Sequence, residues 1–243
     1  FGNTDAFLAI LQEQPNNLVK FLTLYSARNR IKVDRKIFFD AHPQLASLWY
    51  SHFFDLYRSA LINPDAWQNL QEHIQYQDER LKNFSNMIDI YFGVTYIDPE
   101  SDRIVKRKIN QSVQNTPICQ NITVKNHPNP HKIAVMSFFW FARHSVYRTL
   151  AEYVNSLMAD YDVTLIDLGN INKELATEGF KEVKSISFKD GTLDLEAIRE
   201  NEFMVIYYPD VGMSTESLFL ANLRLAPIQV CGVGHSVSPF GSE

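Results

Sequence analysis

Two histidines in the sequence follow apolar segments, and the residues around them are of types suited to proton transfer or anion binding. His144 comes shortly after the apolar run 132–139 and is followed by Ser145, Tyr147 and Arg148, which can all donate hydrogen bonds. The residues after His144 have the pattern of a helix, and the first turn of a helix favours an anion. The alternative is a loop histidine whose ring is satisfied by the backbone.

The second histidine, His235, lies in Gly234-His235-Ser236 after the apolar run 227–233. If both runs are strands of one parallel sheet, their carboxyl ends meet at the edge where such sheets bind ligands. We therefore predict a candidate site at this edge that includes both histidines.

The sequence lacks the common nucleotide-binding and hydrolase motifs. Phe139, Trp140 and Phe141 stand where a glycine-rich dinucleotide loop would follow the first strand, and bulky side chains there keep a pyrophosphate away from the backbone. There is neither a P-loop nor a Gly-x-Ser-x-Gly nucleophile elbow. The carboxylates of Asp160 and Asp162 could hold a divalent cation. Because they precede a strand at the opposite edge, we expect a solvated turn there.

The elements that position the histidines alternate in the second half of the sequence. This alternation predicts a Rossmann-like lobe over residues 132–243, with five parallel strands and helices on the faces of the sheet. The strands are expected at 132–139, 163–169, 183–188, 203–208 and 227–233, and the helices at 145–160, 172–178, 193–200 and 214–224.

Residues 1–125 have instead the pattern of an all-α domain. Apolar side chains recur every three or four residues between Pro43 and Leu61, which is the spacing of a helix face. Asp34 is a candidate cap for a helix over 35–40. Prolines disfavour helix in residues 126–131, which we predict to be a linker, and seven of the nine glycines follow it. Further helices are expected at 66–81, 83–92 and 104–113.

The composition is that of an ordinary globular protein. Of 243 residues, 45% are hydrophobic and 21% charged, and the net charge of −5 argues against a main role in binding nucleic acid. Cys119 and Cys231 match no metal or redox spacing, so we expect free thiols in a cytoplasmic protein, with one distant disulfide as the alternative. No apolar run approaches the roughly 20 residues of a membrane span. Neither end has the features of a natural terminus, and we expect a piece of a longer chain.

Two clusters of basic residues in the helical part leave a second function open. Most such clusters are solvated helix faces. They could also be the docking face of a non-catalytic interaction module that binds a partner through its helical domain. The first cluster comprises Arg28, Arg30, Lys32, Arg35 and Lys36, and the second comprises Arg103, Lys106, Arg107 and Lys108.

Six segments together resemble a known family of enzymes. In the predicted lobe they are 143–149 (RHSVYRT), 208–213 (YPDVGM) and 222–235 (NLRLAPIQVCGVGH). In the helical part they are 45–50 (LASLWY), 89–93 (DIYFG) and 105–110 (VKRKIN). These segments resemble glycosyltransferase family 41, and most closely its branch of bacterial cytoplasmic N-glycosyltransferases that modify adhesins, which are distant relatives of the O-GlcNAc transferases.

The resemblance implies a two-lobed GT-B enzyme, of which this chain is expected to hold the helical domain and the first lobe but not the second. It implies transfer of a hexose from a UDP-sugar to a side chain of an acceptor protein or peptide, with Asn favoured and Ser or Thr as the alternative. It also implies inversion of configuration without a metal ion or a further cofactor.

The resemblance also implies roles for individual residues. His144 is expected near donor and acceptor as a general base or orienting group, and His235 beside the sugar-nucleotide. Because both lobes of a GT-B enzyme contribute to its site, this chain alone is expected to be inactive and to bind UDP weakly. The other implied substrate-binding residues are Ser145, Tyr147, Arg148, Gly234 and Ser236.

Overall fold

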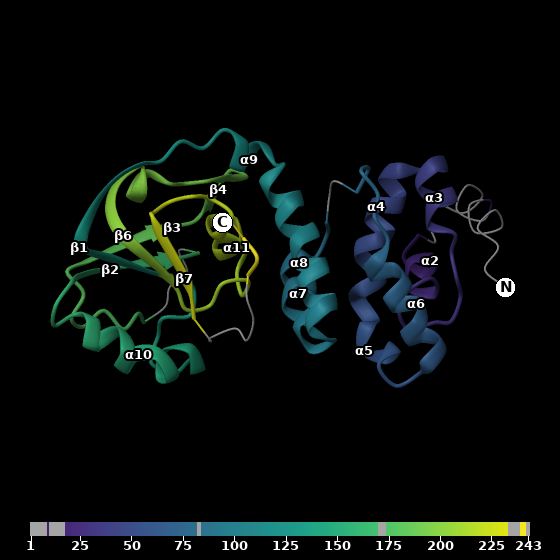
Figure 1. The fold of residues 1–243 in the computed structure, drawn as a ribbon, viewed down its shortest axis with the longest axis horizontal. Helices are drawn as coiled ribbons and strands as arrows, with labels where there is room; N and C mark the ends of the chain where they lie inside the picture. The colour runs from purple at the N-terminus through teal and green to yellow at the C-terminus, as the bar shows by residue number, and fades with distance from the viewer. Residues whose placement is uncertain (1–8, 10–17, 82–83, 170–173, 233–238, 242–243) are drawn as a thin grey trace. The chain divides into compact units, whose positions relative to one another are not determined.

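The chain forms helices in its first part and a parallel sheet in its second part (Figure 1). The computed structural model describes residue 9 and residues 18–81, 84–169, 174–232 and 239–241. The chain divides into two compact units, residues 1–112 and residues 113–243. The linker predicted at 126–131 lies within the second unit.

The described part of the first unit consists of short helices joined by turns. Two of them begin at residues whose side chains cap the helix. Asp34 Oδ1 accepts a hydrogen bond from the Ile37 amide at 3.0 Å, which confirms the helix predicted after Asp34. Asn63 caps α6 in the same way. The helices are α2 (Leu18–Leu24), α3 (Arg35–Ala41), α4 (Pro43–His52), α5 (Tyr57–Ala60), α6 (Pro64–Gln75), α7 (Met87–Gly93) and α8 (Pro99–Gln114), with 3-10 turns at Phe53–Leu56 and Val94–Tyr96.

Two helices are shorter than the apolar pattern predicts. The helix expected over 43–61 is interrupted after His52 by the 3-10 turn, and the helix expected over 66–81 ends at Gln75. At that end Lys108 Nζ donates to the carbonyl oxygens of Ile74 at 2.6 Å and Tyr76 at 2.5 Å. The last carbonyl groups of a helix have no partner within it, so this lysine closes α6 as a cap supplied by a neighbouring helix.

Lys106 and Lys108 of the second basic cluster, and Arg35 of the first, do not contribute to the surface patch that an interaction module would need. Lys106 is completely buried, and its Nζ lies 2.9 Å from Asp102 Oδ1. Lys108 points at carbonyl oxygens of the first unit, and only 10% of the Arg35 side chain is exposed. The predicted docking face is therefore wrong at these residues, because the helices turn them toward packed interior groups.

The first unit contains a buried histidine, His73. The His73 ring is fully buried and stacks on Phe53 at 3.8 Å and on Tyr50 at 4.1 Å between ring centroids. Its Nδ1 accepts from Arg35 Nε at 3.2 Å, and its Nε2 lies 3.0 Å from the carbonyl oxygen of Tyr50. With Nδ1 as the acceptor, Nε2 carries the proton and donates, so the ring is neutral. Burial, together with the charge of Arg35, holds the pKa of His73 well below its ordinary value.

The buried His73 predicts a loss of stability in acid. The folded ring stays neutral, whereas the ring of the unfolded chain takes up a proton below about pH 6.5, so unfolding binds a proton in that range. The free energy of unfolding should therefore fall with decreasing pH by up to about 1.4 kcal/mol per pH unit from this residue. Urea denaturation between pH 7.5 and pH 5 measures how steeply the free energy of unfolding changes with pH. In His73→Gln this slope should be smaller by the amount that corresponds to the uptake of one proton on unfolding. Equal slopes in the two proteins would contradict the prediction.

The second unit contains the five parallel strands predicted from the sequence, in the spatial order β3-β2-β1-β6-β7. This α/β arrangement is compatible with a Rossmann-like lobe. The central strand β1 pairs with β2 on one side and with β6 on the other, so the chain reverses its direction across the sheet at β1 and β6. The strands are β1 (Lys125–Ser137), β2 (Asp162–Leu168), β3 (Glu182–Ile186), β6 (Glu200–Tyr208) and β7 (Ile228–Cys231). The short helix α9 (Pro117–Gln120) precedes β1.

Residues 126–131, which were expected to be a linker, lie in the first half of β1. Lys125 pairs with Glu200 of β6, and the register between the two strands shifts twice before Ile133. Strand β2 pairs with β1 only from Lys132 onward, so the earlier residues form an edge. An edge with bulges accommodates the prolines at 128 and 130, which have no N–H to donate.

Two of the four helices predicted between the strands are confirmed, as α10 (Ser145–Leu157) and α11 (Thr215–Ala221). Where a helix was expected over 172–178, residues 174–178 of the described chain are not helical. Where a helix was expected over 193–200, the described chain has only a 3-10 turn at Glu196–Ile198 before β6 begins at Glu200. A hairpin of β4 (Phe188–Lys189) and β5 (Thr192–Leu193), which was not predicted, precedes this turn. Asp190 and Gly191 have φ values of 49° and 75°, the Asp-Gly geometry of a tight hairpin turn.

Helix α10 covers one face of the sheet. Its residues Val146, Leu150 and Val154 are buried against β1 and β2, where Val135, Val163 and Leu165 complete the core. Trp140, from the loop after β1, is buried in the same cluster. The N-terminus of α10 is thereby held close to the end of β1.

No helix among the described residues has the length and apolar character needed to cross a membrane. Cys119 and Cys231 are free thiols, as expected from their spacing.

Candidate functional site

The candidate site lies where the carboxyl ends of β1 and β6 meet. These strands are neighbours, and connections run away from them in opposite directions across the sheet. A switch point of this kind is the place where open α/β sheets bind ligands. The loop after β1 ends at His144, and the loop after β6 contains Asp210.

His144 is the N-cap of α10. Its Nδ1 accepts a hydrogen bond from the Val146 amide at 3.2 Å, which satisfies one of the free N–H groups of the first turn. A ring nitrogen that accepts carries no proton, so we assign the proton of the neutral ring to Nε2. In this state Nε2–H is a donor, and the ring has no second lone pair to accept a proton.

Aromatic side chains fix the plane of the His144 ring. Phe139 stacks on it with 4.2 Å between ring centroids and an interplanar angle of 17°, and Phe141 lies 5.4 Å away. This burial, with a smaller contribution from the positive charge of Arg148, lowers the pKa of His144 below its ordinary value. The imidazole is therefore neutral at pH 7.

The structure places Ser145 and Arg148 in the exposed first turns of α10, next to His144. Tyr147 is half-buried instead, with its ring in edge contact with Trp140 at 5.3 Å. The N-terminus of this 13-residue helix therefore presents amide groups of its first turn together with the guanidinium group of Arg148. The remaining predicted residues, Gly234, His235 and Ser236, lie outside the described residues.

Asp210 is a completely buried residue at the candidate site that the sequence analysis did not single out. Its Oδ2 accepts from Ser137 Oγ at 2.8 Å, from the Phe138 amide at 3.0 Å and from the Phe139 amide at 2.8 Å. In dinucleotide-binding sheets the amides after the first strand face a pyrophosphate, whereas here they face a carboxylate of the protein. The signal in the sequence was an aspartate directly after an apolar strand, in Tyr208-Pro209-Asp210.

Tyr207, near the same end of β6, carries another hydroxyl group besides that of Ser137. Its ring packs beside the core under α10, and a Cβ added at Gly232 would lie 2.2 Å from its hydroxyl oxygen. Glycine at 232 is therefore what allows the backbone at this one position to lie so close to the ring. Burial, followed by the nearby Cys231 and Asp210, raises the pKa of the Tyr207 phenol.

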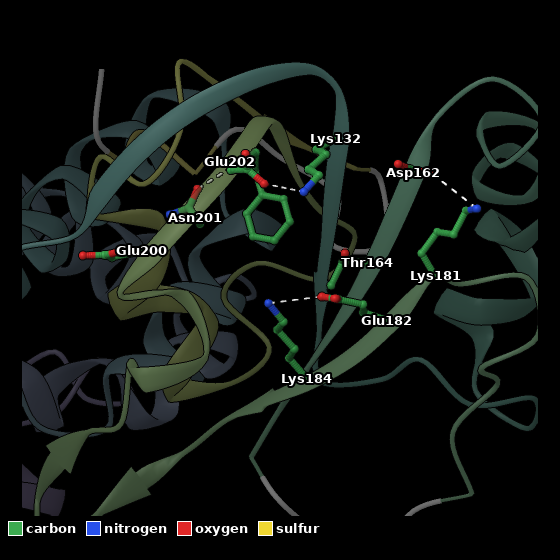
Figure 2. A pocket seen from close by; sticks show the side chains of 10 residues that line it. Lys132, Asp162, Thr164, Lys181, Glu182, Lys184, Glu200, Asn201 and Glu202 are labelled. Atoms are coloured by element: carbon green, nitrogen blue, oxygen red, sulfur yellow. Dashed lines mark hydrogen bonds and ion pairs between the residues drawn. The ribbon is translucent and has the colours of Figure 1, made fainter.

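A separate cavity of about 470 Å³ lies at the opposite edge, among residues at or near the amino ends of β2, β3 and β6 (Figure 2). Ion pairs line it, joining Lys132 to Glu202, Lys184 to Glu182, and Lys181 to Asp162 (Figure 2). Asp162, a possible ligand of a divalent cation by its residue type, takes part in one of these partly exposed ion pairs. Within the described ranges no three His, Cys, Asp or Glu side chains come together in a way that could hold a metal ion.

No protein-family model matches the chain. It is similar to two curated proteins named UDP-glucose:protein N-beta-glucosyltransferase, from Actinobacillus pleuropneumoniae serotype 5b (strain L20) and serotype 7 (strain AP76). The identities are 25% and 26%, in each case over 97% of this chain and 43% of the relative. The chain thus spans less than half the length of these relatives, and a completing second lobe stays a prediction. The similarity to these two proteins confirms the resemblance to bacterial protein N-glycosyltransferases.

Proposed function

We propose that the protein carrying this chain transfers glucose from UDP-glucose to a side chain of an acceptor protein. The observation that carries the proposal is similarity along 97% of the chain to two relatives named for this activity. Within the proposal, asparagine is the favoured acceptor, with serine or threonine as the alternative, and the transfer inverts the configuration at the sugar without a metal ion or further cofactor.

His144 serves in this reaction as a hydrogen-bond donor that orients a reactant. The cap bond from the Val146 amide to Nδ1 supports this role, because it leaves Nε2–H as the free group of the ring. To act as a base at Nε2, the ring would have to move its proton to Nδ1 and give up the cap. The lowered pKa of His144 supports a neutral ring at pH 7, which donates through Nε2–H without carrying a charge.

The N-terminus of α10 contributes to holding the donor. The amides of its first turn and the exposed Arg148 favour a negatively charged group, such as the diphosphate of a UDP-sugar. Ser145, which is exposed in the same turn, adds a hydroxyl group. His235 remains proposed to lie beside the sugar-nucleotide, on the resemblance alone.

The experiment is intact-mass analysis of the full-length protein with UDP-glucose and three peptides that differ only in carrying Asn, Gln or Ser at one position. We expect one added hexose on the Asn peptide and none on the Gln peptide. The reaction should proceed equally in EDTA, and NMR of the product should show the anomer opposite to that of the donor. If no peptide gains a hexose, the proposal fails. If only the Ser peptide does, transfer holds and the preference for Asn is wrong.

The alternative function, a non-catalytic module that docks a partner through its helical part, rested on the basic clusters. Lys106 is buried and Lys108 points at carbonyl oxygens, so these residues do not support it. Loss of partner binding in Arg103→Glu, together with unchanged glucose transfer in His144→Ala, would support the interaction-module function instead.

A further inference from the structure

The loop that carries His144 is tied to β6 by one buried carboxylate. Asp210 Oδ2 accepts the Ser137 hydroxyl and the amides of Phe138 and Phe139, all within 3.0 Å. Asp210 has no exposed surface. It lies more than 70 positions along the sequence from the three residues that donate to it. A charged acceptor makes stronger hydrogen bonds than a neutral one, and burial strengthens them further. The turn after β1 is therefore held at its first two residues.

The two residues whose amides Asp210 holds are also fixed through their rings. Phe138 packs so closely on Gly169 that a Cβ added there would lie 2.3 Å from the ring. The ring of Phe139 contacts Phe138 at 4.8 Å and stacks on His144 at 4.2 Å. A displacement of the 138–139 backbone would therefore shift the ring against which His144 is stacked.

Two contacts of the His144 ring bear on its tautomer and its plane. One is the bond from the Val146 amide to Nδ1, which helix α10 supplies. The other is the Phe139 ring, whose backbone Asp210 holds. The first contact selects the tautomer, and the second sets the plane of the ring and shields one side of it from water.

We propose that Asp210 is a positioning residue, which holds the turn at 138–139 so that Phe139 fixes the plane of the His144 imidazole. The consequence for glucose transfer rests on the proposed function, whereas the consequence for the His144 ring does not. Without the carboxylate the turn at 138–139 is no longer held in place, and Phe139 no longer stacks on the His144 imidazole. The orientation of the Nε2–H group is then no longer fixed.

The test compares Asp210→Ala and Asp210→Asn in the full-length protein. Alanine removes the acceptor, whereas the amide oxygen of asparagine can still accept from the two backbone amides. For Asp210→Ala we expect kcat to fall about 10- to 100-fold, as for a misplaced reacting group, with a much smaller change in the KM for UDP-glucose. Asp210→Asn should recover part of the loss. The matched control is Ser217→Ala, which removes a buried hydroxyl that accepts from the Gly212 amide of the same loop and donates to the Ser214 carbonyl oxygen, but does not touch 138–139.

A second measurement separates positioning from a purely structural role. NMR titration of the ¹⁵N-labelled histidine rings reports the pKa and tautomer of His144. In Asp210→Ala the pKa should rise toward its ordinary value, because the ring loses the cover of Phe139, and the acid limb of the pH profile of kcat should move with it. Ser217→Ala should leave both unchanged. If Asp210→Ala does not fold, kcat and the His144 titration are compared in Ser137→Ala and Asp210→Asn against the same Ser217→Ala control.

The proposal is overturned if Asp210→Ala leaves the His144 titration and kcat as in the wild type, or if Ser217→Ala changes them equally. If the wild-type protein transfers no glucose, the proposed function fails, and the His144 titration still decides the role of Asp210.

Discussion

Replacing Lys106 by alanine is expected to lower the free energy of unfolding by about 3–5 kcal/mol. Lys106 is completely buried in α8, and its ammonium lies 2.9 Å from the carboxylate of Asp102, which is 1% exposed. The ammonium also donates to Thr95 at 3.2 Å and lies 4.9 Å from the centre of the Tyr91 ring. Removing the cation leaves a buried carboxylate without its countercharge. This destabilises the fold more than replacing both charged residues by apolar ones would. Urea denaturation measures the change.

The neighbouring Arg103→Ala is the matched control for this prediction. Arg103 also pairs with a carboxylate of its own helix, that of Glu100 three residues away, whereas Asp102 is four residues from Lys106; 39% of the Arg103 side chain is exposed. An exposed pair contributes about 0–1 kcal/mol, so this variant should be nearly as stable as the wild type. The double variant Lys106→Met with Asp102→Leu should recover most of the loss, since it removes both charges and retains apolar volume. A similar effect of the two single alanine variants would contradict the burial argument.

Replacing His144 by alanine in the full-length protein is expected to lower kcat/KM for glucose transfer about 100- to 1,000-fold, the effect of removing one donor from a preorganised site. Two further variants identify the role. His144→Gln keeps an N–H donor and cannot be a base, so it should retain clearly more activity than alanine. His144→Asn restores a good cap for α10 but does not reach as far as imidazole, so it should be folded and as inactive as alanine.

Each outcome of the His144 series has a distinct meaning. Equal loss in the glutamine and alanine variants would indicate a base rather than an orienting group. Wild-type activity in the asparagine variant would reduce His144 to a helix cap. In the wild type, activity should decline only as the pH falls through the lowered pKa of His144, because the neutral ring is the competent form and burial preserves it below the ordinary range. A decline that begins at or above about pH 6.5 would contradict that assignment.

The sequence by itself determined the features that depend on neighbouring residues. Alternating apolar runs predicted the five parallel strands, because a buried strand needs only a short apolar segment with turn signals around it. Asp34 predicted the start of α3, because a cap acts over three residues. The Asp-Gly pair at 190–191 was also a local signal for a hairpin, and the sequence analysis did not use it.

Only the tertiary structure decided which polar side chains face inward and what they meet there. In the sequence, Lys106 and Arg103 belong to one basic cluster, yet the packing of α8 buries the first and leaves the second at the surface. Asp210 meets the amides of Phe138 and Phe139 because the sheet order places β6 beside β1. Contacts between residues far apart in the chain depend on which elements pack together, whereas capping and periodicity act within one element, and that is why the sequence alone located His144 but not the group that holds it.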